Sequence, residues 1–269
     1  WNQHATPNGF RAKDLQIFET PAMPPLSMWG EPDSTTFYLR GRNYMTDGIK
    51  EPSVPSLFRL VAFDLFAFEA SEDRFNVASR SDNWLNAGST PIKGTMVESD
   101  SKQPFTLVLN VIVPSRNNLC VVAYYQPREA DILQRSELPE VALFWSWLHG
   151  DETFRNERLK LIPRVAKGPV LVRRGVGATP VLLGKKITVR YYATANTMEI
   201  DLDVSSDTVA NTVTRLVRDK MANSVCLDMG VTLEGRCSQE LPERMLCALR
   251  CDHIDFLHVP RKMPPRTTL

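Results

Sequence analysis

The chain has 269 residues, 43% of them apolar, which suffices for the core of one large domain or two small ones and excludes a globally disordered chain. Its net charge of +1 at pH 7 excludes a general attraction to nucleic acid or membranes, so any such attraction must come from a local basic patch. No apolar run approaches the ~18 residues that a membrane-spanning helix requires.

Proline marks both ends of the chain. Residues 1–35 hold five prolines and predict an extended arm lying on the body, because proline removes backbone donors and resists helix. Residues 260–269 form a basic, proline-rich tail, and residues 36–259 are predicted to be a single domain. Within it, residues 71–103 are rich in Ser, Asp, Asn and Gly and predict a long surface loop. The chain begins with Trp1 rather than Met, so we expect a trimmed or processed N-terminus.

Apolar alternation predicts strands in the body of the chain. One strand is predicted over 105–113 and a partner over 119–125, after a turn-prone Ser-Arg-Asn-Asn stretch. A half-buried strand is predicted over 225–233, where apolar residues alternate with Cys, Asp, Gly, Thr and Glu. A final strand or helix is expected after Pro242.

Two helices are predicted from helical spacing and end signals. The first begins near Pro139 and ends at Gly150, which suits proline in a first turn and glycine at a stop. The second covers 206–222, and Ser205-Ser206-Asp207 can cap it. Its apolar positions are Val209, Val213, Leu216, Val217 and Met221.

A hairpin is predicted around residues 193–196. Pairing Val189 with Ile200, and Arg190 with Glu199, places apolar residues on one side and opposite charges on the other. The acidic row of Glu199, Asp201 and Asp203 is therefore predicted to be mostly structural. These elements predict an α+β fold, with a curved antiparallel sheet packed with a long amphipathic helix. A helix-grip arrangement like that of lipid-transfer proteins is one form of it.

Motifs of catalysis and metal binding are weak. Near Gly184-Lys185-Lys186, a lysine replaces the hydroxyl residue that a P-loop needs, and Pro180 would block the following helix. No catalytic residues, cofactor or metal ligands are expected, and an enzyme would have to use Asp201, Asp203, Asp228 or His149. The Cys and His spacings match no standard zinc site. The five cysteines suggest no disulfide framework and favour a reducing, intracellular compartment.

The most informative stretch is basic. From Arg155 to Arg190 it carries ten Lys or Arg residues and one Glu. Such clustered cations attract the phosphates of lipids, or of nucleic acid, which ranks lower because no aromatic-basic nucleotide-binding motif is present. The equally weighted alternative is pairing with the acidic residues of 199–255, where eleven Asp or Glu exceed six Lys or Arg. The residues proposed to bind an anionic ligand are Arg155, Arg158, Lys160, Arg173, Arg174, Lys185 and Lys186.

Several ordered stretches resemble the C-terminal domain of plant Enhanced Disease Resistance proteins. The resemblance runs from about residue 37 to 255. The matching stretches include Phe37-x-x-Arg40-Gly41-x-x-Tyr44, residues 104–114, 124–125, 154–163, 177–186, 191–192 and 198–204, Glu234-Gly235 and 240–243. In plant members this domain follows lipid-binding modules, and those proteins restrain defence signalling and cell death. The family implies no catalytic residues.

Three functional hypotheses follow. The first is a non-enzymatic domain that binds a hydrophobic or anionic lipid-like ligand at a membrane surface, which predicts an internal apolar pocket with a basic mouth. The second is a structural or adaptor subunit of a larger complex, a complex on an organelle membrane being one form of it, which predicts ordered termini that leave the body. An enzyme is third. The expected location is intracellular, at the periphery of a membrane.

Overall fold

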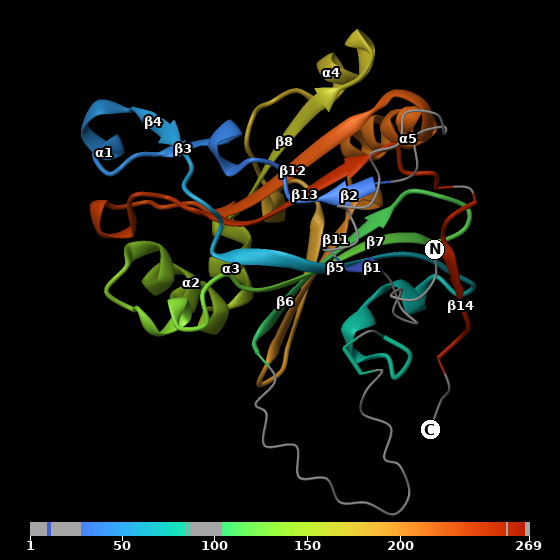
Figure 1. Cartoon of the computed structure of the whole chain (residues 1–269), viewed down its shortest axis with the longest axis horizontal. Helices are drawn as coiled ribbons and strands as arrows, with labels where there is room; N and C mark the ends of the chain where they lie inside the picture. The colour runs from blue at the N-terminus through green and yellow to red at the C-terminus, as the bar shows by residue number, and fades with distance from the viewer. Residues whose placement is uncertain (1–9, 12–27, 84, 87–103, 257, 267–269) are drawn as a thin grey trace, which may run out of the picture.

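The structure, a computed structural model, describes residues 10–11, 28–83, 85–86, 104–256 and 258–266. Two sheets dominate them, with helices at the periphery (Figure 1). The larger sheet has the order β1 (Phe10–Arg11), β5 (Phe58–Phe68), β7 (Leu119–Pro127), β6 (Thr106–Val113), β11 (Thr197–Asp203), β10 (Thr188–Ala193), and β14 (Arg261–Met263) also pairs with β5. The smaller has the order β2 (Met28–Gly30), β13 (Met245–Asp252), β12 (Cys226–Leu233), β8 (Leu159–Lys167), β9 (Val181–Leu182).

Helices and one small hairpin complete the described part. The hairpin pairs β3 (Tyr38–Arg40) with β4 (Lys50–Pro52). The α-helices are α1 (Tyr44–Asp47), α2 (Pro139–His149), α3 (Glu152–Arg158), α4 (Val170–Val176) and α5 (Thr208–Ser224). Among these residues, no helix is both long and apolar enough to cross a bilayer. The α+β class and the mostly antiparallel pairing are thus confirmed, and only the β6–β11 and β5–β14 pairs are parallel among the described strands.

The main core lies between the two sheets and under α2. Trp147 and Phe144 of α2 are fully buried, and Phe144 packs on Phe58 with ring centroids 5.2 Å apart. Strand β5 runs through the centre with apolar side chains on both faces, because Phe63 belongs to this core and Phe66 to a second cluster behind the sheet. A strand covered on both faces needs no polar alternation.

The predicted strands and the first helix are confirmed in place. Residues 105–113, 119–125 and 225–233 match β6, β7 and β12, the element after Pro242 is strand β13, and α2 has Pro139 at its start and Gly150 as its C-cap. The second helix exists as α5, capped by Asp207, but Val209 is exposed and α5 packs against α4. A long amphipathic helix held in a curved sheet, and the helix-grip fold, are therefore not confirmed.

The predicted hairpin register is wrong by two residues. Val189 pairs with Leu202 rather than Ile200, and Arg190 pairs with Asp201 rather than Glu199. The faces are nevertheless right, because a shift of two residues leaves every side chain on the same side of the sheet. The turn decides the register: the N–H of Thr194 donates to the carbonyl of Thr197, which leaves a two-residue loop.

The prediction of a long surface loop over 71–103 is wrong for its first part. Two 3-10 helices, η3 (Glu72–Arg74) and η4 (Val77–Ser79), are followed by residues that include buried Arg80 and Asn83. The polar composition misleads because these polar groups are hydrogen-bonded inside the protein. Residues 87–103 lie outside the described residues.

Both terminal segments contribute to the sheets where they are described. Strand β2 pairs with β13, and β1 and β14 both pair with β5. Within the described residues, the C-terminal segment therefore lies along the body rather than leaving it (Figure 1).

Candidate functional site

Two of the predicted anion-binding residues lie in internal ion pairs. Lys160 on β8 places its Nζ 2.7 and 2.9 Å from the two carboxylate oxygens of Glu243. Arg158, at the end of α3, pairs with Glu240 and donates to the carbonyl of Glu234 at 3.1 Å. Burial lowers the pKa of Lys160, an effect that Glu243 opposes. These contacts match the pairing with the acidic 199–255 segment that the sequence left open.

The same buried charges extend to the small hairpin. Arg40 on β3 lies 3.2 Å from a Glu234 oxygen and 3.7 Å from a Glu243 oxygen, and it donates to the carbonyl of Gly235 at 2.6 Å. Lys160 lies 3.9 Å from Glu234. The network ties the hairpin and the 234–243 segment to β8. Four of its members, Arg40, Lys160, Glu234 and Glu243, are among the residues that carry the family resemblance.

Arg155 is also turned inward. Its guanidinium donates to the carbonyls of Trp147 and Leu148 at 3.2 and 2.7 Å, and it lies over the ring of Tyr191. It thereby satisfies carbonyls at the C-terminal end of α2, which a helix leaves without internal partners.

The other four predicted residues are exposed but lie in two places. Lys185 and Lys186 follow β9, which pairs with β8 at Lys160 and Leu161. Arg173 and Arg174 lie on α4, which follows the other end of β8. A strand rises about 3.3 Å per residue, so roughly 20 Å of β8 separates the two places. The structure therefore does not gather the seven residues into one site.

Helix α4 exposes apolar and basic side chains together. Val172 is buried, and a Cβ at Gly175 would lie 3.7 Å from Leu216, which shows how closely α4 approaches α5. Outward, Val170 is 64% exposed and Leu171 is 67% exposed. Residues three and four apart share a helix face, so Arg173 and Arg174 lie beside these apolar side chains. Figure 1 shows α4 standing out beyond the end of β8.

Sequence reasoning identified the two α4 arginines but missed Val170 and Leu171. The signal available was the run Val170-Leu171-Val172 directly before Arg173-Arg174. Its three apolar residues would ordinarily be assigned to a core, and only the packing of α4 shows that two of them face outward.

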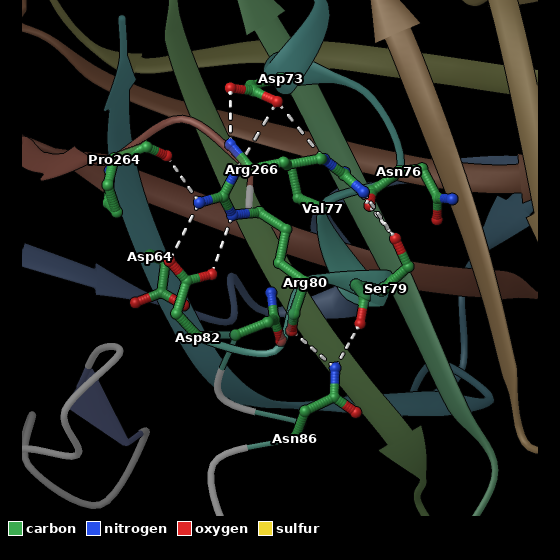
Figure 2. Close-up of polar contacts among 12 residues, drawn as sticks. Asp64, Asp73, Asn76, Val77, Ser79, Arg80, Asp82, Asn86, Pro264 and Arg266 are labelled. Carbon is green, nitrogen blue, oxygen red and sulfur yellow. Dashed lines mark hydrogen bonds and ion pairs between the residues drawn. The ribbon is translucent and has the colours of Figure 1, made fainter. Parts of the chain in front are cut away.

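A separate buried polar network joins the 72–86 segment to the C-terminal segment (Figure 2). Arg80 is almost fully buried, donates twice to Asp82 at 2.9 Å and donates to the carbonyl of Pro264 at 2.8 Å. Arg266 donates to the carbonyls of Phe75 and Asn76 at 2.7 and 2.6 Å. The network therefore fixes two segments that are distant in sequence.

Carboxylates of the larger sheet hold the 72–86 segment from its inner side. Glu199 accepts hydrogen bonds from the N–H groups of Val77 and Ala78 at 2.8 and 2.7 Å, and Asp201 accepts from the N–H of Asn76 at 2.9 Å. Burial, followed by the neighbouring Asp201, raises the pKa of Glu199 well above its usual range. These contacts support the predicted structural role of Glu199 and Asp201, although the partners are backbone N–H groups and, for Asp201, the side-chain amide of Asn110 at 2.9 Å.

The polar residues that an enzyme would need occur in separate settings. Asp201 and Asp203 share strand β11 of the larger sheet, where Asp203 accepts from the N–H of Ser205, whereas Asp228 belongs to the smaller sheet. His149 stacks on Trp145 and bonds its carbonyl at 3.0 Å. Within the described part of the chain, no three His, Cys, Asp or Glu residues are placed to hold a metal ion, and all five cysteines are free.

A small pocket lies between α2 and the 233–246 segment. Glu140, Glu240 and Glu243 line it, together with Arg244 and several leucines. With three carboxylates and one guanidinium at its wall, it does not have the basic mouth expected of an anionic-lipid pocket.

The comparisons place the chain in a family. Residues 29–255 match the family described as "Protein ENHANCED DISEASE RESISTANCE 2, C-terminal". A "Protein ENHANCED DISEASE RESISTANCE 2-like" of Arabidopsis thaliana is 35% identical over 229 residues, which are 85% of this chain and 29% of that protein. The chain thus spans less than a third of this relative's length. No solved structure matches it. This chain belongs to the family of the Enhanced Disease Resistance 2 C-terminal domain, as its sequence predicted.

Proposed function

We propose that the chain is a non-enzymatic binding domain that docks on an anionic membrane surface through α4. The observation that supports this proposal is the exposed face of α4, where Val170 and Leu171 lie beside Arg173 and Arg174. The two arginines make no side-chain ion pair or hydrogen bond with any described residue. Apolar side chains that enter the headgroup region, flanked by cations that meet anionic lipid, are typical of peripheral membrane proteins.

The expected strength follows from these four side chains. Full burial of a Val or Leu side chain is worth about 1.5–3 kcal/mol, so two that are roughly two-thirds exposed can contribute about 2–4 kcal/mol together. Each Arg near an anionic surface adds about 1 kcal/mol. The total is a weak and reversible attachment, which suits a domain that acts within a longer protein or together with other contacts.

The test is co-sedimentation with phosphatidylcholine vesicles that contain phosphatidylserine. Replacing Arg173 and Arg174 by alanine removes about 2 kcal/mol and should weaken binding ~30-fold. The matched control is the double variant K185A/K186A, which removes two exposed lysines at the other end of β8 and should change binding less than about twofold. Equal losses of vesicle binding in both variants would mean that binding depends on the overall charge of the chain rather than on α4. Unchanged binding of R173A/R174A would refute the proposal.

An adaptor role is the second candidate, favoured by another exposed surface. Tyr38, Ile49 and Val54 of the β3–β4 region are each more than half exposed. A protein partner could cover these side chains. Purification of the native assembly, with and without the triple variant Y38S/I49S/V54S, would test it: loss of a stoichiometric partner chain supports an adaptor, and an unchanged composition argues against it.

The name of the Arabidopsis relative ties that protein to disease resistance. This chain covers only 29% of that protein, so the name alone does not assign the same process to it. We include a role in disease resistance in the proposal.

A further inference from the structure

Two arginines and one aspartate form a cross-strand row on the smaller sheet. Arg164 of β8, Asp228 of β12 and Arg250 of β13 are direct register partners, so their side chains stand on the same face. Arg164 Nη1 lies 2.7 Å from Asp228 Oδ2, and Arg250 Nη2 lies 2.9 Å from the same oxygen. Arg250 Nε adds a 2.7 Å bond to Oδ1. The two guanidinium groups therefore lie side by side.

The row leaves donors open to solvent. The Asp228 side chain is fully buried, whereas the side chains of Arg164 and Arg250 are 38% and 37% exposed. Among the described residues, Nε and Nη2 of Arg164 and Nη1 of Arg250 have no hydrogen-bond partner. A single carboxylate thus holds two guanidinium groups in place without using all their N–H groups. Such preorganised donors lose little conformational freedom when they bind an anion.

The charge around the row is positive by one. Lys167 is exposed and pairs with Cys226, two residues before Asp228, after a register shift that places it beside the row. Asp252 of β13 pairs with Cys226 from the other side and is partly exposed. Three cations therefore face two carboxylates, and α4 with its two arginines begins directly beyond Lys167.

We infer that Arg164 and Arg250 bind a phosphomonoester, the chemical group shared by some lipid headgroups and by small phosphate esters. Its three acceptor oxygens and charge near −2 suit two adjacent guanidinium forks, whereas a single carboxylate offers only two oxygens and one charge. The inference rests on the proposed function only in taking a membrane as the source of the phosphate. There α4 would supply attachment, and the arginine pair would supply headgroup selectivity.

The site itself can be tested without a membrane. Arginine Nε–H signals of the isotope-labelled chain are followed during titration with glycerol 3-phosphate. Saturable shifts of the Arg164 and Arg250 signals, with an unmoved Arg135 signal as the internal control, support the site. The variant R164K keeps the charge beside Asp228 but loses the planar fork, so it should weaken binding about tenfold while the chain stays folded. Absence of a saturable shift, or unchanged affinity in folded R164K, would overturn the inference.

Vesicles then identify the source of the phosphate. Phosphatidylcholine vesicles are prepared with either phosphatidic acid, a phosphomonoester lipid, or phosphatidylserine, matched in surface charge. We expect the wild-type chain to prefer phosphatidic acid, R164K to lose that preference, and R173A/R174A to bind both vesicles more weakly. Equal binding to both vesicles, unaffected by R164K and without saturable glycerol 3-phosphate shifts, overturns the inference and leaves the proposed function standing. Binding to neither vesicle, with the glycerol phosphate shifts intact, overturns the proposed function and leaves a site for soluble phosphate esters.

Discussion

The buried pair of Lys160 and Glu243 tests whether Lys160, a residue of the basic segment, stabilises the fold rather than binding a ligand. The Glu243 side chain is fully buried and that of Lys160 is 7% exposed. Glu243 also accepts from the N–H groups of Arg40 and Gly235 at 3.2 and 3.1 Å. We therefore predict that E243A destabilises the chain strongly, because it leaves a buried ammonium group without its carboxylate.

The magnitudes follow from what each change leaves behind. Removing one partner of a buried ion pair costs about 3–5 kcal/mol, and E243A should fall in this range. K160M should cost less, about 1–3 kcal/mol, because Glu243 keeps Arg40 and two backbone N–H groups as partners. The double variant K160M/E243A leaves no buried ammonium group without a carboxylate and should cost less than the sum of the single variants. The expected coupling is about 2–3 kcal/mol.

Urea unfolding of the four chains measures this cycle. The exposed pair of Arg135 and Glu129 is the control, and E129A should cost less than about 1 kcal/mol. Additive losses for Lys160 and Glu243 would refute the role assigned to the pair. So would a K160M chain of unchanged stability that binds vesicles poorly, because Lys160 would then belong to the binding surface.

Three further predictions concern the rest of the fold. Burial raises the pKa of Asp64 to about 8, so the folded state holds a proton that the unfolded state has lost above about pH 4. The unfolding free energy should therefore fall as pH rises from about 4 to about 8, and D64N should flatten that slope in urea titrations; an identical slope in D64N would contradict the assignment. A Cβ at Gly184 would lie 2.3 Å from Cβ and 2.5 Å from Cα of Asn156. We therefore expect G184A to lower the unfolding free energy by about 1–3 kcal/mol. An unchanged melting temperature would show that the neighbouring atoms move apart at no cost. E199A should leave the backbone N–H groups of Val77 and Ala78 unpaired and speed their hydrogen exchange. Equal exchange rates in E199A and the wild-type chain would mean that Glu199 does not hold this segment in place.

Local patterns in the sequence predicted the elements but could not fix how they meet. Alternation located the hairpin strands and their faces, yet it cannot distinguish registers that differ by two residues. Strand β5 carries no alternation, because it is covered on both sides, and it was not predicted. The parallel pairing of β11 with β6 joins strands separated by more than eighty residues, and neither sequence carries a sign of it.

The basic segment shows the same limit for charges. Its composition predicted either a ligand site or internal pairing, and the structure divides it into internally paired and solvent-exposed residues. Arg158 and Lys160 meet acidic residues of the 234–243 segment, while Arg173 and Arg174 face outward on α4. The division depends on burial, and burial depends on the packing of β8 in the smaller sheet, which a list of charges does not contain.

The internally paired residues and the exposed residues of the basic segment also differ in their relation to the family resemblance. Arg40, Lys160, Glu234 and Glu243 belong to the resemblance and form a buried network, so these matching residues hold the β3–β4 hairpin and the 234–243 segment against β8. Helix α4 and Arg164 lie in residues 164–176, between the matching stretches 154–163 and 177–186. The matching stretches therefore do not include the surface that we propose to bind a membrane, although the family match over residues 29–255 spans it. Two members with the same buried network can share the fold and still recognise different surfaces, so binding has to be measured on each chain rather than carried over from a relative.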